Sequence, residues 1–201
     1  MELIEELNVR YPQLRSCEGA ISRALNLLLA CYRGGGKVLT CGNGGSAADA
    51  EHIVGELMKK FRRHRTVDPE IAAKLPPELV AKLEGALPAV SLVSMSGILT
   101  AFANDVAWET AFAQQVLGLG RAGDVLIALS TSGNSANCVN AALVAKAKGM
   151  SVISLTGATG GRLAELADAA ICVPETETYK VQELHLPVYH ALCARVEEEL
   201  F

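Results

Sequence analysis

The segment KVLTCGNGGS (residues 37–46) decides the fold, because an apolar run typical of a buried strand passes directly into a glycine- and serine-rich turn. The segment DVLIALSTSGNS (residues 124–135) repeats this arrangement, and apolar residues with helical spacing follow both turns. Strands that alternate with helices predict a parallel sheet covered by helices on both faces. Ligands of such sheets bind beyond the carboxyl ends of the strands, where both turns would lie.

The same reading extends the pattern to five strands in one domain over residues 1–201. Amphipathic helical material is expected from residue 1 to about 33, where three glycines end it, and a further helix from about 46 to 62. The other helices are expected at 99–103, 108–118, from about 136 to 149 and from about 178 onward. The expected strands lie at 37–41, 89–94, 124–129, 151–155 and 169–173. The predicted fold class is α/β, a three-layer αβα sandwich around a mainly parallel five-stranded sheet.

Length and composition exclude several functional classes. The 201 residues are 50% hydrophobic, which suits one larger domain with a sizeable core, but no apolar run reaches the roughly 20 residues of a membrane span. The opening residues MELIEE do not match a secretory signal peptide. A net charge of −4 argues against nucleic acid as the main partner. Six cysteines without CxxC spacing predict reduced thiols in a cytoplasmic protein.

Both turns have the chemistry of an anion site. Backbone N–H groups, hydroxyls and the helix dipole all favour negative charge where a glycine- and serine-rich turn opens a helix. A single such turn is also explained by the small residues that any tight turn needs, whereas two predict a pocket for a phosphorylated small molecule. Nucleotides are disfavoured, since the first turn is not GxGxxG and neither turn is followed by Gly-Lys-Ser/Thr.

Six motifs in order resemble the sugar isomerase (SIS) domain, and specifically its phosphoheptose isomerase branch. The resemblance covers nearly the whole chain; STSGNS marks the wider superfamily, and the pairs His52/Glu56 and Gln182/His190 indicate the narrower branch. It implies a flavodoxin-like sheet, N-terminal helices that pack in a homotetramer, sites at subunit interfaces, and a bound zinc ion. The motifs are CGNGGS (41–46), DAEHIVGE (49–56), ND (104–105), GDVL (123–126), STSGNS (130–135) and QELH (182–185).

The resemblance also assigns substrate-binding roles. Asn43, Gly44 and Ser46 would contact the sugar or its phosphate, and Asp105 would contact sugar hydroxyls. Simple turn chemistry remains an alternative for the first group, and a loop cap for Asp105. Ser135 is also a plausible helix N-cap. The remaining substrate ligands implied by the family are Ser130, Thr131, Ser132, Ser135 and Gln182.

His52 and Glu56 lie one helical turn apart, so they project from one face and can share a metal ion or a substrate. By resemblance, Glu56 is the base that removes a carbon-bound proton and His190 the opposing acid, with zinc held by His52, Glu56, Gln182 and His190. Eight helical residues rise about 12 Å, near the limit for Gln182 and His190 at one ion. Either Gln182 lies at or before the first turn, or the ligands come from different subunits; His185 is the rival ligand.

The implied reaction converts sedoheptulose 7-phosphate to D-glycero-D-manno-heptose 7-phosphate through an enediolate. The alternatives are non-catalytic: an SIS protein that binds a replication initiator, of the DnaA initiator-associating type, or a sensor of a phosphosugar. Residues 66–87 depart from the family pattern as an insertion. The basic run at 59–65 is interpreted as a solvated helix end, although Lys60 aligns with a family position near the substrate.

Overall fold

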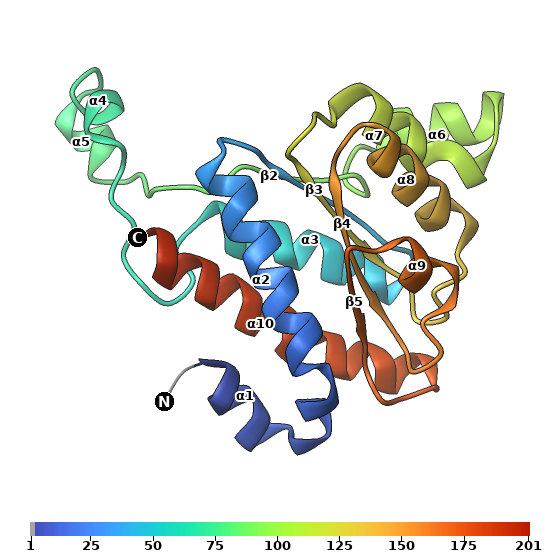
Figure 1. Ribbon diagram of the computed structural model, residues 1–201. Coiled ribbons are helices and arrows are strands. Elements are labelled where there is room, and N and C mark those ends of the chain that lie inside the picture. Colours follow the sequence, from blue (N-terminus) through green and yellow to red (C-terminus); the bar gives the residue numbers. More distant parts are fainter. Residues whose placement is uncertain (1–2) are drawn as a thin grey trace.

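A parallel five-stranded sheet forms the centre of the computed structural model, which describes residues 3–201 (Figure 1). The strands lie in the order β2-β1-β3-β4-β5, and every neighbouring pair is parallel. This order is the flavodoxin-like one, so the predicted fold class is confirmed. The strands are β1 (Val38–Cys41), β2 (Ala89–Ser91), β3 (Val125–Leu129), β4 (Ser151–Thr156) and β5 (Ala169–Cys172).

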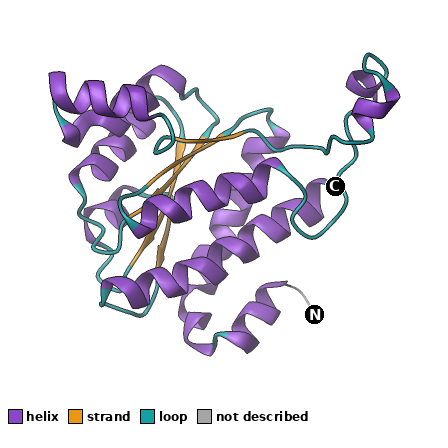
Figure 2. Ribbon diagram, turned by 180° about the vertical axis from the view of Figure 1, so that it is seen from behind, coloured by secondary structure: helices purple, strands orange, loops and turns teal. Residues whose placement is uncertain are grey.

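Helices cover both faces of the sheet (Figures 1 and 2). One face carries α2 (Glu18–Arg33), α3 (Gly45–Met58) and α10 (Thr178–Leu200), and α1 (Leu3–Arg10) packs on α10. The other face carries α6 (Ser96–Asp105), α7 (Ala111–Leu119), α8 (Ala136–Ala147) and α9 (Gly161–Leu166). Among residues 3–201, no helix has both the length and the apolarity needed to cross a bilayer.

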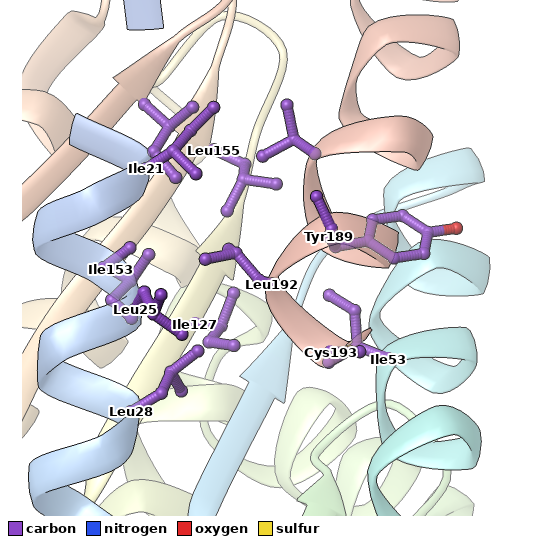
Figure 3. Packing of buried hydrophobic residues seen from close by; sticks show 14 of the residues in the cluster. Ile21, Leu25, Leu28, Ile53, Ile127, Ile153, Leu155, Tyr189, Leu192 and Cys193 are labelled. Carbon is purple, nitrogen blue, oxygen red and sulfur yellow. The ribbon is translucent and has the colours of Figure 1, made fainter. Parts of the chain in front are cut away.

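The alternation of side chains along each strand divides the core into two clusters. In β3, Ile127 and Leu129 point into the cluster beneath α2, α3 and α10, while Leu126 and Ala128 point into the other. Figure 3 shows the first cluster, where Ile21 of α2 and residues of β3 and β4 meet the inner face of α10. Burial on both faces explains the unbroken apolar runs that identified the strands.

The N-terminal helical region is interrupted, contrary to expectation. A 3-10 helix (Pro12–Cys17) separates α1 from α2, because proline suits the first turn of a new helical segment and cannot continue the old one. The segment expected at 108–118 is likewise a 3-10 turn (Trp108–Thr110) followed by α7. The second strand ends at Ser91, shorter than the predicted 89–94.

The helix α3 ends at Met58, four residues before the predicted end, because the chain turns to wrap around Glu197 of α10. The backbone N–H groups of Phe61, Arg62 and Arg63 donate to the Glu197 carboxylate at 2.7–3.0 Å. Arg65 is fully buried, pairs with Glu197 at 2.7 Å, and donates to the carbonyl groups of the last turn of α3. The interpretation of residues 59–65 as a solvated helix end is therefore wrong for the helix, which ends earlier, and for the buried Arg65, whereas Lys59, Lys60, Arg62 and Arg63 are exposed as expected.

Residues 66–84, here called the arm, leave the body of the molecule and return to it (Figure 1). The arm contains α4 (Pro69–Ala72) and α5 (Pro77–Val80), neither of which has a buried residue. Its base is closed where the Gly85 N–H donates to the Arg65 carbonyl at 3.0 Å. That residues 66–87 are an insertion relative to the family stays a prediction.

Candidate active site

The two glycine-rich loops meet at one edge of the sheet, as the sequence predicted. They follow β1 and β3, which are neighbours in register, with Cys41 opposite Ala128. The direction of the strand order reverses between these two strands, which is the usual ligand crevice of such sheets. Asn43 of the first loop and Asn137 of α8 join the loops by two side-chain amide hydrogen bonds of 2.9 and 2.8 Å.

The first loop needs its glycines for two physical reasons. Gly44 has φ +58°, in the left-handed region that side chains with a Cβ disfavour. A Cβ on Gly45 would lie 2.7 Å from the side-chain amide of Gln182, so glycine lets α10 approach the N-terminus of α3 closely. Ser46 is buried in the first turn of α3. Gln182 therefore belongs to this loop region.

The second loop presents hydroxyl groups to a small cavity. Ser130 and Ser135 join their hydroxyls at 2.9 Å, so the Ser135 side chain does not cap α8, although Ser135 occupies the N-cap position. Thr131 and Ser132 line a cavity of about 180 Å³. Its other lining residues are Gly157, Ala158, Thr159, Glu175, Thr176 and Thr178. Thr131 and Ser132 of the predicted phosphate loop thus line this cavity, whereas Ser130 and Ser135 bond to each other at the start of α8.

A second polar cluster forms between α3 and α10. His52 Nε2 lies 3.1 Å from Glu56 Oε1 and 3.4 Å from His190 Nε2. The Glu56 side chain is only 12% exposed, and Lys59 Nζ donates to its second oxygen at 3.1 Å. The His52 and His190 rings meet edge to face, with centroids 4.9 Å apart. The structure therefore brings together the predicted base Glu56, the predicted acid His190 and His52, which are three of the four predicted zinc ligands.

Two residues that the sequence analysis did not assign complete this cluster. The Tyr189 hydroxyl lies 2.9 Å from His52 Nδ1 and donates to Asp49 Oδ1 at 3.2 Å. Burial raises the pKa of Asp49, an effect that the Tyr189 hydrogen bond opposes. Burial and the nearby His52 lower the pKa of His190, which favours its neutral ring. The sequence could have pointed to both residues, since Asp49 lies one helical turn before His52 and Tyr189 directly precedes His190.

The donor set suits a zinc ion. Zinc binds histidine nitrogens and carboxylate oxygens at about 2.0–2.1 Å in a tetrahedron, whose ligand atoms are then about 3.3 Å apart. The distances of 3.1 and 3.4 Å around His52 Nε2 are close to that value. Within residues 3–201, no three His, Cys, Asp or Glu side chains are already gathered as a metal cluster. Binding would thus require Glu56 and His190 to draw together around His52.

The remaining predicted ligands lie elsewhere. Gln182 is in the second turn of the continuous helix α10, so the alternative that placed it at or before the first turn is wrong. It packs at Gly45, whereas His190 meets His52 two turns further along α3. His185 is fully buried with Nε2 at 3.2 Å from the Thr156 carbonyl, which removes it as a rival ligand.

Asp105 ends α6 as an exposed residue. Its carboxylate accepts a hydrogen bond from the Asn104 side chain at 2.8 Å. No contact found among residues 3–201 joins Asp105 to either polar cluster. Its role at the sugar hydroxyls stays a prediction.

A cavity of about 270 Å³ opens beside His190. It lies between α1, α10 and the residues that follow α3, so the N-terminal helix forms one wall of the space next to the predicted acid. Arg10 of α1 and Arg62, which follows α3, bring positive charge to the cavity, and Glu6 of α1 opposes it. The other lining residues are Leu7, Tyr11, Phe61, Leu186, Pro187, Ala191 and Ala194.

Fold and site together define a parallel α/β protein with two glycine- and serine-rich loops at one edge of the sheet and a histidine–carboxylate cluster between adjacent helices. Comparison with known proteins leads to a family with this fold and these loops. The family model for the SIS domain matches residues 5–86 and 78–157. A phosphoheptose isomerase of Rhodospirillum rubrum is 44% identical over 188 residues, covering 94% of this chain and 90% of the relative.

Two solved structures show the same likeness. The phosphoheptose isomerase of Neisseria gonorrhoeae aligns with a TM-score of 0.77 and 35% identity, covering 96% of this chain and 94% of that one. The phosphoheptose isomerase of Francisella tularensis aligns with a TM-score of 0.79 and 31% identity, covering 94% and 91%. The chain belongs to the SIS domain family, in its phosphoheptose isomerase branch. The resemblance found from the motifs, and with it the expectation of an isomerase-type enzyme, is confirmed.

Proposed function

We propose that this protein is a phosphosugar aldose–ketose isomerase that converts sedoheptulose 7-phosphate to D-glycero-D-manno-heptose 7-phosphate. The observation that carries the proposal is that His52 and Glu56 of α3 meet His190 of α10. The helix α3 begins at the phosphate-type loop. Neither a structural histidine nor a simple surface ion pair explains a largely buried carboxylate that contacts His52, whose ring nitrogen in turn meets His190. The branch to which the chain belongs supports the heptose phosphate.

The spacing along α3 suits such a substrate. Gly45 opens the helix beside the loops, and His52 follows seven residues later, a rise of roughly 10 Å. A phosphorylated sugar lying along α3 would place its phosphate among the hydroxyls of residues 130–135 and its carbonyl end near Glu56. The two halves of the site then match the two ends of one elongated molecule.

The chain's own residues divide the proton transfers between them. Glu56 would remove the proton from the carbon next to the carbonyl, which gives an enediolate, and His190 would return a proton to the neighbouring carbon or oxygen. A hydrogen bond from Lys59 and the 3.1 Å contact with His52 Nε2 hold the two Glu56 oxygens in orientation. A neutral imidazole, the form favoured at His190, can serve as the acid in isomerisations of this kind.

His52, Glu56 and His190 would hold the zinc ion, a His₂Glu set that leaves one position open. A bound zinc ion supplies Lewis acidity that polarises a carbonyl and stabilises developing negative charge. Gln182 of the same chain contacts the start of α3, so it would complete the ligand set only across a subunit interface. This agrees with the homotetramer that the family resemblance implies, with its sites at the subunit interfaces, and we propose that assembly here.

Incubation of the protein with sedoheptulose 7-phosphate, with and without a chelator, tests the proposal. Product is followed by NMR, and binding is followed separately by calorimetry. Turnover that the chelator abolishes and zinc restores is the expected result. Binding without turnover would indicate a phosphosugar sensor instead.

If the protein neither binds nor converts the sugar phosphate, the isomerase proposal is refuted. The replication-initiator hypothesis is then tested by pull-down with the initiator protein.

Ser132→Ala serves as a binding-site variant, since Ser132 lines the cavity of the second loop. It should raise KM with little effect on kcat if the phosphate binds there.

A further inference from the structure

Tyr189 joins two helices through its hydroxyl group. Its ring is buried in α10, and Figure 3 shows it directed away from the core cluster toward α3. The hydroxyl there meets both Asp49 and His52, which lie one turn apart on α3. Asp49 Oδ2 is buried and has no hydrogen-bond partner, so Tyr189 supplies the side-chain hydrogen bond that this carboxylate receives.

The protons in this network can be counted. Three links run in series, from Asp49 to Tyr189, from Tyr189 to His52 Nδ1, and from His52 Nε2 to Glu56. Each link needs one proton, but a tyrosine hydroxyl and a neutral imidazole supply only two. If Tyr189 gives its proton to Asp49, its oxygen must accept from Nδ1–H of His52. The lone pair of Nε2 then faces the Glu56 carboxylate and His190, where a further proton or a metal cation would satisfy it.

We propose that Asp49 and Tyr189 are positioning residues, which hold the proton on Nδ1 of His52 and thereby present Nε2 as a metal ligand. This inference rests on the proposed function, because the cation is taken to be the zinc ion of that site. A ligating histidine commonly donates its other N–H to a fixed acceptor, and loss of such an acceptor costs about 10- to 100-fold in metal affinity. Here the acceptor is a phenol oxygen that a carboxylate orients in turn.

The first test measures zinc affinity by competition with a chromophoric chelator. Tyr189→Phe keeps the packed ring and removes the oxygen, so zinc should bind about tenfold more weakly. Tyr32→Phe is the matched control, because its hydroxyl donates to the Pro88 carbonyl at 3.4 Å, away from both loops and the cluster. Its zinc affinity should equal that of the wild type.

A pair of Asp49 variants separates positioning from packing. Asp49→Ala removes the acceptor, which frees the Tyr189 proton to point at Nδ1 and turns His52 into the wrong tautomer for binding. Asp49→Asn keeps an acceptor oxygen and should restore most of the zinc affinity. Nitrogen-15 NMR of the histidine rings in the zinc-loaded protein should show a slowly exchanging Nδ1–H on His52 in the wild type. That signal should be lost in Tyr189→Phe.

These measurements can overturn the positioning role of Asp49 and Tyr189. Unchanged zinc affinity in Tyr189→Phe, or a wild type that binds no zinc, overturns the positioning role. If Tyr189→Phe does not fold, equal affinities of Asp49→Ala and Asp49→Asn overturn it. The proposed function can fail while the positioning role holds. This would be the case if the variants bind zinc more weakly but the wild type converts no sugar phosphate.

Discussion

Arg65 is expected to stabilise the junction between α3, α10 and the arm more than any exposed cation of the same basic run. Its side chain and that of Glu197 are both 0% exposed, with Nε and Oε1 2.7 Å apart. The guanidinium also donates to the carbonyl groups of Glu56 and Leu57, which the end of α3 leaves unpaired. Arg65→Met removes the charge and all these donors while keeping an unbranched apolar side chain.

The magnitude follows from burial. Removal of one partner from a buried ion pair costs about 3–5 kcal/mol, because the other charge stays buried without its counter-ion. Three backbone N–H groups still donate to Glu197 in the variant, which favours the lower end of this range. For a chain of this length each kcal/mol lowers Tm by about 2–4 °C, so a fall of about 10 °C is expected.

Urea unfolding followed by circular dichroism measures the change. Arg63→Met is the matched control, since Arg63 is 55% exposed and reaches Glu198 only at 3.4 Å, a contact worth about 0–1 kcal/mol. Glu197→Leu also takes the acceptor from three backbone N–H groups, so it should be destabilising by itself. The double variant Arg65→Met/Glu197→Leu should therefore lose less stability than the sum of the two single variants, because no charge is left buried. An Arg65→Met protein as stable as Arg63→Met would refute the reasoning.

Three further predictions concern pH and packing. Burial alone raises the pKa of Glu197, but its N–H donors and Arg65 outweigh burial and lower the pKa below 4.5. The stability difference between the wild type and Glu197→Gln should therefore hold above pH 4.5 and vanish as the pH falls through the folded pKa; a difference that persists in acid contradicts this. Burial lowers the pKa of His185 to about 4, so the free energy of unfolding should fall by up to about 3 kcal/mol as the pH drops from about 6.5 to 4. In His185→Met this pH dependence of the unfolding free energy should disappear. Gly45→Ala should displace Gln182 and raise KM. Gly55→Ala is the control: its added Cβ meets no atom, so it should raise only the stability, by about 0.5–1 kcal/mol. Equal KM values for the two variants would count against the contact between Gly45 and Gln182.

The sheet and the meeting of the two loops were predictable because they depend on local patterns. Apolar runs fixed the five strands, and turn residues placed a loop after β1 and after β3. Parallel pairing then brought both loops to one edge, as Cys41 opposite Ala128 shows. His52 and Glu56 were equally accessible to sequence reasoning, since one helical turn alone sets their contact.

The rest depends on contacts between residues far apart in the sequence. No local signal distinguishes the buried Arg65 from its exposed neighbours, because its partner Glu197 lies 132 residues later. Tyr189 has the pattern of a core residue, and only the packing of α10 on α3 turns its hydroxyl toward Asp49 and His52. The family motif groups Gln182 with His190, but both lie on the continuous helix α10, where eight residues separate them by a rise of about 12 Å.

Isomerisation of sedoheptulose 7-phosphate in heavy water by the wild type and Glu56→Gln tests the central claim most directly. The amide keeps the shape of Glu56 but cannot take a carbon-bound proton, so the rate should fall by about 10²- to 10⁴-fold, with solvent deuterium no longer entering the product. Glu51→Gln controls for the loss of a carboxylate on the same helix, since Glu51 is exposed and accepts from Ser94. Wild-type rates of turnover and deuterium incorporation in Glu56→Gln would show that another group is the base.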